Sequence, residues 1–209
     1  MTNIISHALG LVLSMVALVL MVIRASLYGN MLQLVSVSIF GVSLIALYTA
    51  STFYHSATDV SLRTRLRIID HATIYVLIAG TYTPVVIATL DGPLRWTVLA
   101  IAWGAVLVGA VQHVFFPRDK QTFSMILAVS MGWLGVVIAW RFVQELGWTA
   151  SGLAILGGAI YTVGMILMVM NRPRLWPRVF SYHEVFHVMV VAASAVHFVL
   201  VWRYVLPLG

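Results

Sequence analysis

The sequence contains no cysteine and few charged residues of either sign. Without cysteine, a disulfide scaffold, a thiolate metal site and a cysteine nucleophile are excluded, so any metal ion must be held by histidine or carboxylate. Charged residues make up 9% of the chain and hydrophobic residues 62%, whereas a soluble domain has about 25% charged residues. So little charge cannot cover a surface in water, and we expect an integral membrane protein.

The basic residues do not resemble a nucleic-acid-binding surface. There are 12 of them against 6 acidic residues, and they form no run or patch between aromatic side chains. In a membrane protein they are expected to face anionic lipid headgroups. Membrane lipids are therefore the expected partners and nucleic acid is not, and the oligomeric state is left open.

Long apolar stretches fill most of the chain. A spanning helix needs about 20 apolar residues, so seven would use roughly 140 of the 209 and leave no room for a second domain. We therefore expect one all-α domain over residues 1–209, a seven-transmembrane helix bundle. Its predicted spans are about 4–23, 30–55, 70–90, 95–116, 122–140, 149–170 and 182–205.

The basic residues are unevenly divided between the two sides of such a bundle. One side carries Arg63, Arg65, Arg67, Arg118, Lys120, Arg172, Arg174 and Arg178. The other side carries Arg24, Arg95, Arg141 and Arg203. Because basic residues favour the cytoplasmic side, this eight-to-four division predicts a cytoplasmic N-terminus and a C-terminus outside.

Histidines gather near the same predicted side. Six of the seven lie at or near span ends there, namely His7, His55, His71, His113, His183 and His187. His197 lies roughly 15 Å deeper than His187 by the rise of a helix. Ionisable groups in spans are costly and tend to face a bundle interior or a partner, so a cluster at one depth is a candidate site.

The spacing within HEVFH at 183–187 is the main indication of a metal site. It places His183 and His187 one turn apart on the same helix face, where two imidazoles can share a metal ion. Two packed or interfacial histidines would show the same spacing. Two further features favour a site: His55 and Asp70 flank a short connection at the same depth, and Ser51 lies one turn before His55 on its face.

Three neutral histidines are a ligand set that leaves a fourth tetrahedral position on Zn²⁺ for water, as in a catalytic zinc site. The metal lowers the pKa of that water towards about 7 and polarises a carbonyl oxygen. Asp70 could accept the proton of the water, and Ser51 could donate a hydrogen bond to a neighbouring group or to a developing charge. This pattern predicts metal-assisted hydrolysis with His55, His183 and His187 as ligands.

A protease interpretation also fits part of the pattern. HEVFH matches H-E-x-x-H, in which the glutamate is the general base of a zinc protease. That interpretation needs a third ligand, which His55 could supply, and a cleft for a peptide. Glu184 has a simpler role as a residue at a helix start, where negative charge suits the helix dipole.

The remaining histidines are expected to lie outside the metal ligand set. We expect His7 to be a membrane-interface residue, although it could also approach the site as a donor. His71 faces about 100° away from Asp70 on a helix, so we assign it no metal role. His197 is expected to form a hydrogen bond inside the core or to line a substrate cavity.

Several segments together resemble the progestin and adipoQ receptor family, and most closely its bacterial branch, the hemolysin III proteins. The resemblance runs from about Ser6 to Tyr204. Its segments are STFYHS at 51–56, IIDHATIYVLIAGTYTP at 68–84, MGWLGV at 131–136, GGAIYTVG at 157–164 and YHEVFHVMVVAASAVHF at 182–198. The family implies seven helices with the N-terminus inside, and a location in the cell membrane, here a bacterial inner membrane.

The resemblance also implies a site. The histidine of S-x-x-x-H and both histidines of H-x-x-x-H hold zinc, and the aspartate lies near the metal through water; the matching positions are Ser51, His55, Asp70, His183 and His187. Related eukaryotic receptors and alkaline ceramidases imply hydrolysis of a lipid amide, and bacterial members imply membrane-lipid homeostasis. We therefore expect a zinc-dependent hydrolase of a membrane lipid amide or ester. A lipid-sensing receptor-like protein with a structural zinc and a membrane-lytic pore-former are the alternatives.

Overall fold

The computed structural model describes residues 2–115, 121–176 and 180–208 and contains no β-strand among them. The expected all-α architecture is confirmed. The α-helices are α1 (Thr2–Tyr28), α2 (Met31–Ser56), α3 (Val60–Thr89), α4 (Gly92–Phe115), α5 (Gln121–Gly132), α6 (Ala139–Val169) and α7 (Tyr182–Leu200). The 3₁₀-helix η1 (Leu134–Ile138) links α5 to α6, and the π-helical η2 (Val201–Val205) and the 3₁₀-helix η3 (Leu206–Leu208) follow α7.

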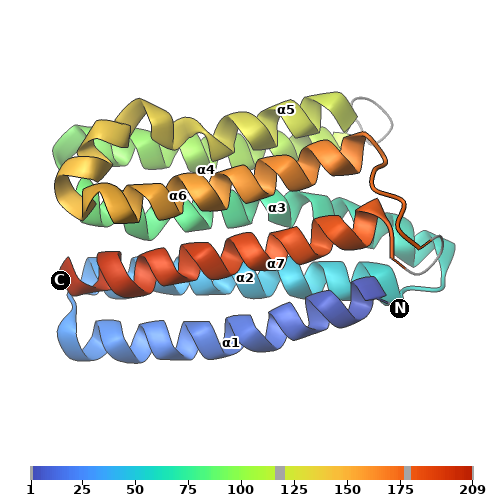
Figure 1. Cartoon of the computed structure of the whole chain (residues 1–209), viewed down its shortest axis with the longest axis horizontal. Coiled ribbons are helices and arrows are strands. Elements are labelled where there is room, and N and C mark those ends of the chain that lie inside the picture. The colour runs from blue at the N-terminus through green and yellow to red at the C-terminus, as the bar shows by residue number, and fades with distance from the viewer. Residues whose placement is uncertain (1, 116–120, 177–179, 209) are drawn as a thin grey trace.

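Six segments of the described chain are long and apolar enough to cross a membrane. Five of them are α1, α2, α3, α4 and the segment Tyr182–Val205, and the sixth is the 47-residue segment Phe123–Val169. The predicted spans 122–140 and 149–170 fall almost wholly within that sixth segment. Gly147, with φ 80° and ψ 172°, is non-helical there, and Figure 1 shows the chain running along α5 and returning along the later part of α6.

The start of α3 differs from the expected connection. The stretch from Asp59 to Arg67 interrupts the apolar pattern, yet α3 already begins at Val60. The Asp59 carboxylate accepts a hydrogen bond of 2.7 Å from the Leu62 amide and caps the helix. Because arginine is a good helix former, Arg63 lies in the first turns of α3 and not in a loop.

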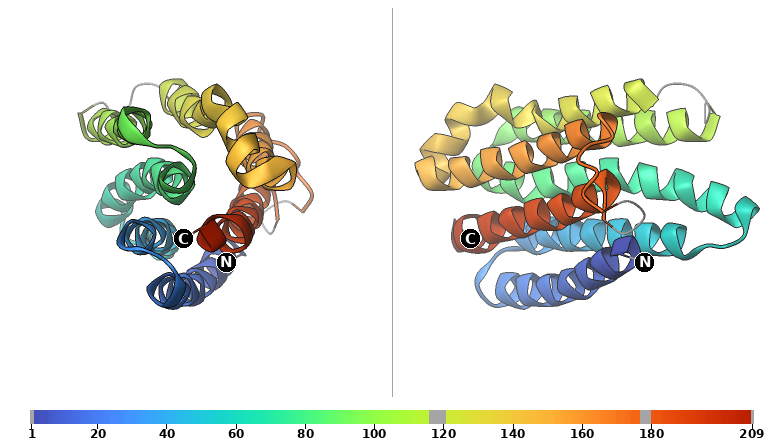
Figure 2. Two further views of the ribbon diagram at one scale, coloured as in Figure 1. Left: turned by 90° about the vertical axis from the view of Figure 1, so that its left-hand side faces the viewer. Right: turned by 45° about the vertical axis from the view of Figure 1, so that its right-hand side comes forward.

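The helices form a ring in which each packs on its neighbours in the chain, and α1 closes the ring against α7 (Figure 2). The two chain termini lie at opposite ends of the bundle (Figure 1). We call the end at which α1, α3 and α7 begin the N-terminal end. Because α2 ends there and α7 begins there, residues 128 positions apart in the sequence meet at this end.

Basic residues occupy both ends of the bundle. Among the described residues, those predicted for the cytoplasmic side are Arg63, Arg65, Arg67, Arg172 and Arg174. Arg118, Lys120 and Arg178 lie outside the described residues. At the opposite end, Arg24 donates a hydrogen bond of 2.9 Å to the Trp202 carbonyl and stacks over the Trp202 ring at 4.6 Å. This contact joins α1 to the C-terminal segment.

The outer face of the ring is apolar and the polar groups point inward. Leu107 and Val137 expose 69% and 83% of their surface, as expected for side chains that face lipid. Inside, the hydroxyl of Ser194 lies 2.9 Å from that of Tyr48 and 2.8 Å from that of Tyr161. A hydroxyl in a hydrocarbon environment needs a hydrogen-bond partner within the protein. These hydrogen bonds supply such partners and join α2, α6 and α7.

The helix break between α5 and η1 is satisfied by one side chain of α3. The Tyr82 hydroxyl donates a hydrogen bond of 2.8 Å to the Gly132 carbonyl and accepts one of 2.8 Å from the Gly135 amide. Backbone groups released by a break inside a membrane need such a partner. Tyr82 therefore allows the MGWLGV segment to leave the α-helical path.

Candidate metal centre

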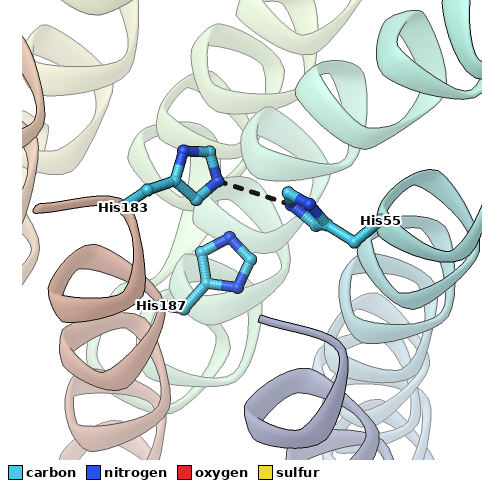
Figure 3. A group of neighbouring side chains, drawn as sticks. All are labelled: His55, His183 and His187. Carbon is cyan, nitrogen blue, oxygen red and sulfur yellow. Dashed lines mark hydrogen bonds between the residues drawn. The ribbon is translucent and has the colours of Figure 1, made fainter. Parts of the chain in front are cut away.

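Three histidines converge at the N-terminal end of the ring. His55 lies in the last turn of α2, and His183 and His187 lie one turn apart at the start of α7. Figure 3 shows the three rings turned toward one another. One nitrogen of each ring lies within 4.8 Å of the corresponding nitrogens of the other two rings. Nε2 of His183 is 3.4 Å from Nε2 of His55.

One of these distances already fits a metal ion. In a tetrahedral site with metal–nitrogen bonds of 2.0–2.1 Å, two ligand nitrogens are about 3.4 Å apart. The separation between His183 and His55 is 3.4 Å, and the ligand nitrogens of all three lie within 4.8 Å of one another. His187 is 3% exposed, and its Nδ1 has no hydrogen-bond partner in the described structure. The three histidines could therefore hold a metal ion if their rings moved closer together.

The start of α7 is fixed by Glu184. Its carboxylate accepts a hydrogen bond of 2.8 Å from the backbone amide of Ser181, three residues earlier, and completes a capping box. The simpler of its two expected roles is thereby supported. A carboxylate that caps its own helix already has a structural role, which favours the simpler expectation over Glu184 as a general base.

Ser51 and Asp70 interact beside the histidines. Ser51 is 2% exposed and precedes His55 by one helical turn. Its side chain interacts with the Asp70 carboxyl group. Both residues line the same cavity as His183 and His187. The structure thus brings all five predicted site residues to one end of the bundle, while their catalytic and metal-binding roles stay predictions.

Of the two expectations for His7, an approach to the site is the one that the structure supports. His7 is 3% exposed, and its ring stacks on that of His187 with centroids 3.7 Å apart and planes at 19°. The Tyr48 ring meets it edge-on at 5.2 Å. Among the described residues, neither ring nitrogen of His7 has a partner with hydrogen-bond geometry. His7 therefore belongs to the site as the residue that packs against a candidate ligand.

A helical pattern in the sequence could have pointed to His7. The buried residues of α1 include His7, Gly10 and Ser14, which follow one another at intervals of three and four residues. Polar and small side chains at helical spacing mark a face that packs against other helices. His7 shares that face, which turns toward the ring interior.

A cavity of about 1080 Å³ extends from the histidines into the bundle. Its polar end is lined by Ser51, Asp70 and His187, and its deeper walls include Leu77 and Phe142. A cavity of this size matches the upper range of small-ligand pockets. It provides apolar space next to the candidate metal centre.

His197 satisfies both of its expected alternatives. Its Nδ1 lies 3.0 Å from the Ala193 carbonyl, and its ring stacks on Tyr161 with centroids 5.8 Å apart. It also lines the cavity. The ring of His71, to which we assign no metal role, lies 5.2 Å from that of His113.

Comparison with known proteins identifies the family. The family model described as "Haemolysin-III related" matches residues 1–198. The chain is 38% identical over 205 residues to "Hemolysin-3" of Bacillus cereus, covering 98% of this chain and 91% of the relative. It is 39% identical over 202 residues to "Hemolysin-3 homolog" of Bacillus subtilis, covering 97% and 92%.

A more distant human protein matches as well. "Monocyte to macrophage differentiation factor" of Homo sapiens is 26% identical over 183 residues, covering 79% of this chain and 68% of the relative. The expected resemblance is confirmed, and the apolar helices together with the bacterial relatives support a multi-pass protein of the cell membrane. With a family model that spans nearly the whole sequence, the chain belongs to the haemolysin-III-related family of membrane proteins.

Proposed function

We propose that this protein is a zinc-dependent hydrolase of a membrane lipid amide or ester, with a role in membrane-lipid homeostasis. The observation that carries the proposal is the convergence of His55, His183 and His187 at metal-ligand spacing beside a large, mostly apolar cavity. Three imidazoles leave one tetrahedral position open, as catalytic zinc sites require. The cavity would hold the acyl chain, with the carbonyl group at the polar end.

When bound, zinc supplies a Lewis acid for the carbonyl oxygen and acidifies a water molecule. In the proposed reaction Asp70 accepts a proton from the attacking water while the water oxygen forms a bond to the acyl carbon. The C–N or C–O bond then breaks, and Asp70 returns the proton to the leaving amine or alcohol. Ser51, whose side chain interacts with Asp70, orients the carboxylate toward the water.

We propose seven membrane crossings with the N-terminus in the cytoplasm. A continuous helix over Phe123–Val169 would be about 70 Å long, more than twice the thickness of the hydrocarbon core. The non-helical backbone of Gly147 and the opposite placement of the chain termini support two crossings in this segment. The uneven distribution of arginines supports the orientation.

The orientation can be tested by labelling single cysteines, because the natural chain has none. Thr58→Cys lies at the N-terminal end and Asp91→Cys at the opposite end, and both positions are exposed. In intact cells a membrane-impermeant maleimide should label the cysteine at 91 and spare the one at 58. The reverse pattern would overturn the proposed orientation.

The hydrolase is tested with three variants. His55→Ala and His187→Ala should lose bound zinc and activity, whereas Asp70→Asn should keep zinc and lose turnover. Purified proteins are incubated with a membrane lipid extract, the products are identified by mass spectrometry, and zinc is measured by elemental analysis. Lipid turnover that persists in the zinc-free histidine variants would sink the proposal. If no lipid yields a product and Asp70→Asn signals as the wild type does, the result would instead favour a receptor-like protein with structural zinc.

The names of the two Bacillus relatives support membrane lysis as a second candidate function. A lytic pore should release a dye trapped in liposomes whether or not zinc is bound. Dye release that needs His55 and Asp70 would point back to an enzyme, because a pore has no use for either residue as a reactant.

A further inference from the structure

A second polar cluster lines the cavity along α3. Arg67, His71 and Tyr75 follow one another at four-residue intervals and therefore share one face of the helix. All three line the cavity. Asp70, about 100° from His71 around the helix axis, lines the same cavity and interacts with Ser51 of α2.

The cluster is completed by α4 and α5. The ring of His113, in the last turn of α4, lies 5.2 Å from the ring of His71, and its Nε2 lies 3.4 Å from the Tyr75 hydroxyl. The Tyr75 hydroxyl also lies 3.3 Å from the Ser124 carbonyl of α5. Tyr75 is buried, and its hydroxyl is the group of α3 that contacts the His113 ring nitrogen. Three helices therefore position the rings of His71 and His113.

The charges around this cluster favour an anion. The Arg67 guanidinium interacts electrostatically with both histidine rings. Among the described residues no carboxylate oxygen lies within 4.0 Å of Arg67. The one ion pair that the described residues form joins Asp91 to Arg95. The cluster thus combines a cation that has no acidic partner among the described residues with two imidazoles, each of which can present an N–H. A guanidinium next to imidazole donors suits phosphate oxygens.

We propose that Arg67, His71 and His113 form a subsite for the phosphate group of a lipid whose chain lies in the cavity. The subsite stands at the same polar end as the three-histidine centre, so one amphiphile can present its phosphate to this cluster and its acyl carbonyl to the other. As a substrate subsite it rests on the proposed hydrolase function and narrows the substrate to lipids with a phosphate-bearing headgroup. Binding of the phosphate, however, needs no turnover.

The test is a binding comparison in a neutral maltoside detergent by titration calorimetry. The probes are oleoyl lysophosphatidic acid, monooleoylglycerol with the same chain, and inorganic phosphate. The wild-type protein should bind the phosphate-bearing lipid about tenfold more tightly than the neutral one. Arg67→Gln and His113→Gln should each remove most of this difference. Arg65→Gln is the matched control, because Arg65 is, like Arg67, an exposed arginine of α3 but does not line the cavity.

Each outcome is decisive. Equal affinity of the wild type for the two lipids, or an equal loss in Arg65→Gln, would overturn the subsite. Inorganic phosphate that binds as tightly as the lipid would show a site for free anions and overturn the assignment to a lipid headgroup. The same titration on His187→Ala separates the subsite from the metal: the preference should survive there, and its loss would assign the phosphate to the metal centre. A preference that survives without any hydrolysis would support the subsite while the hydrolase fails.

Discussion

The stack of His7 on His187 makes a quantitative prediction about metal binding. In His7→Ala the side chain that packs against a candidate ligand at 3.7 Å and against Tyr48 at 5.2 Å is removed. An aromatic pair contributes about 1 kcal/mol beyond the area it buries, so a His187 ring that loses its stack should bind zinc about fivefold more weakly. The buried hole left behind should cost the folded protein about 3 kcal/mol as well.

A conservative variant separates packing from hydrogen bonding. His7→Phe keeps a ring of similar shape and removes both ring nitrogens, which have no hydrogen-bond partner in the described structure. If packing orients His187, His7→Phe should keep the zinc affinity within about twofold of the wild type. If a nitrogen of His7 reaches the metal, His7→Phe should lose as much affinity as His7→Ala.

The assay is zinc competition against a chromophoric chelator in detergent, with thermal unfolding of the metal-free proteins alongside. Measuring the two quantities separately matters, because a general loss of stability would lower the unfolding temperature without changing the zinc affinity of the folded fraction. An unchanged zinc affinity of folded His7→Ala protein would refute the argument that the stack positions His187.

Four further variants test three other contacts. Gly157→Ala would place a methyl group against the His197 ring, whose Nδ1 would be 2.7 Å away, and should lower the unfolding temperature by the equivalent of about 2 kcal/mol. Gly158→Ala, which meets open space, should not, and equal effects of the two would contradict the packing. Tyr82→Phe releases two backbone groups and should destabilise the fold by about 2 kcal/mol in thermal unfolding; no change would mean that other partners satisfy them. Glu184→Gln should leave lipid turnover and zinc content nearly unchanged, whereas a loss of turnover with zinc retained would revive Glu184 as the general base.

The sequence predicted the parts of the structure that depend on local pattern. The length of apolar runs is a local property, so the helices could be located, and the spacing of His183 and His187 fixes their shared face whatever surrounds them. The start of α3 was misjudged because Arg63 and its neighbours end the apolar pattern without ending the helix. Charged residues mark where the apolar run ends, whereas helix ends depend on caps such as Asp59.

The contacts that were missed depend on closure of the ring. His7 reaches His187 only because α1 packs against α7, which lies at the other end of the chain. His113 reaches His71 only because α4 packs beside α3 in this register. Neither neighbour is visible in the spacing of residues along one helix, so a single sequence could place these histidines at the correct depth but not beside their partners.

The helices around the cavity differ in how firmly the bundle holds them. In the most apolar 18-residue windows of α2 and α3, 50% of the residues are buried. In the corresponding window of the segment Phe123–Val169, 11% are buried. Segments with few buried contacts open at a lower free energy than the whole domain. Amide exchange should therefore reach α5 and α6 well before α2 and α3. Because His55, His183 and His187 lie outside the loosely held segment, the proposed hydrolase could admit a lipid laterally by local opening on that side while these three histidines keep their positions.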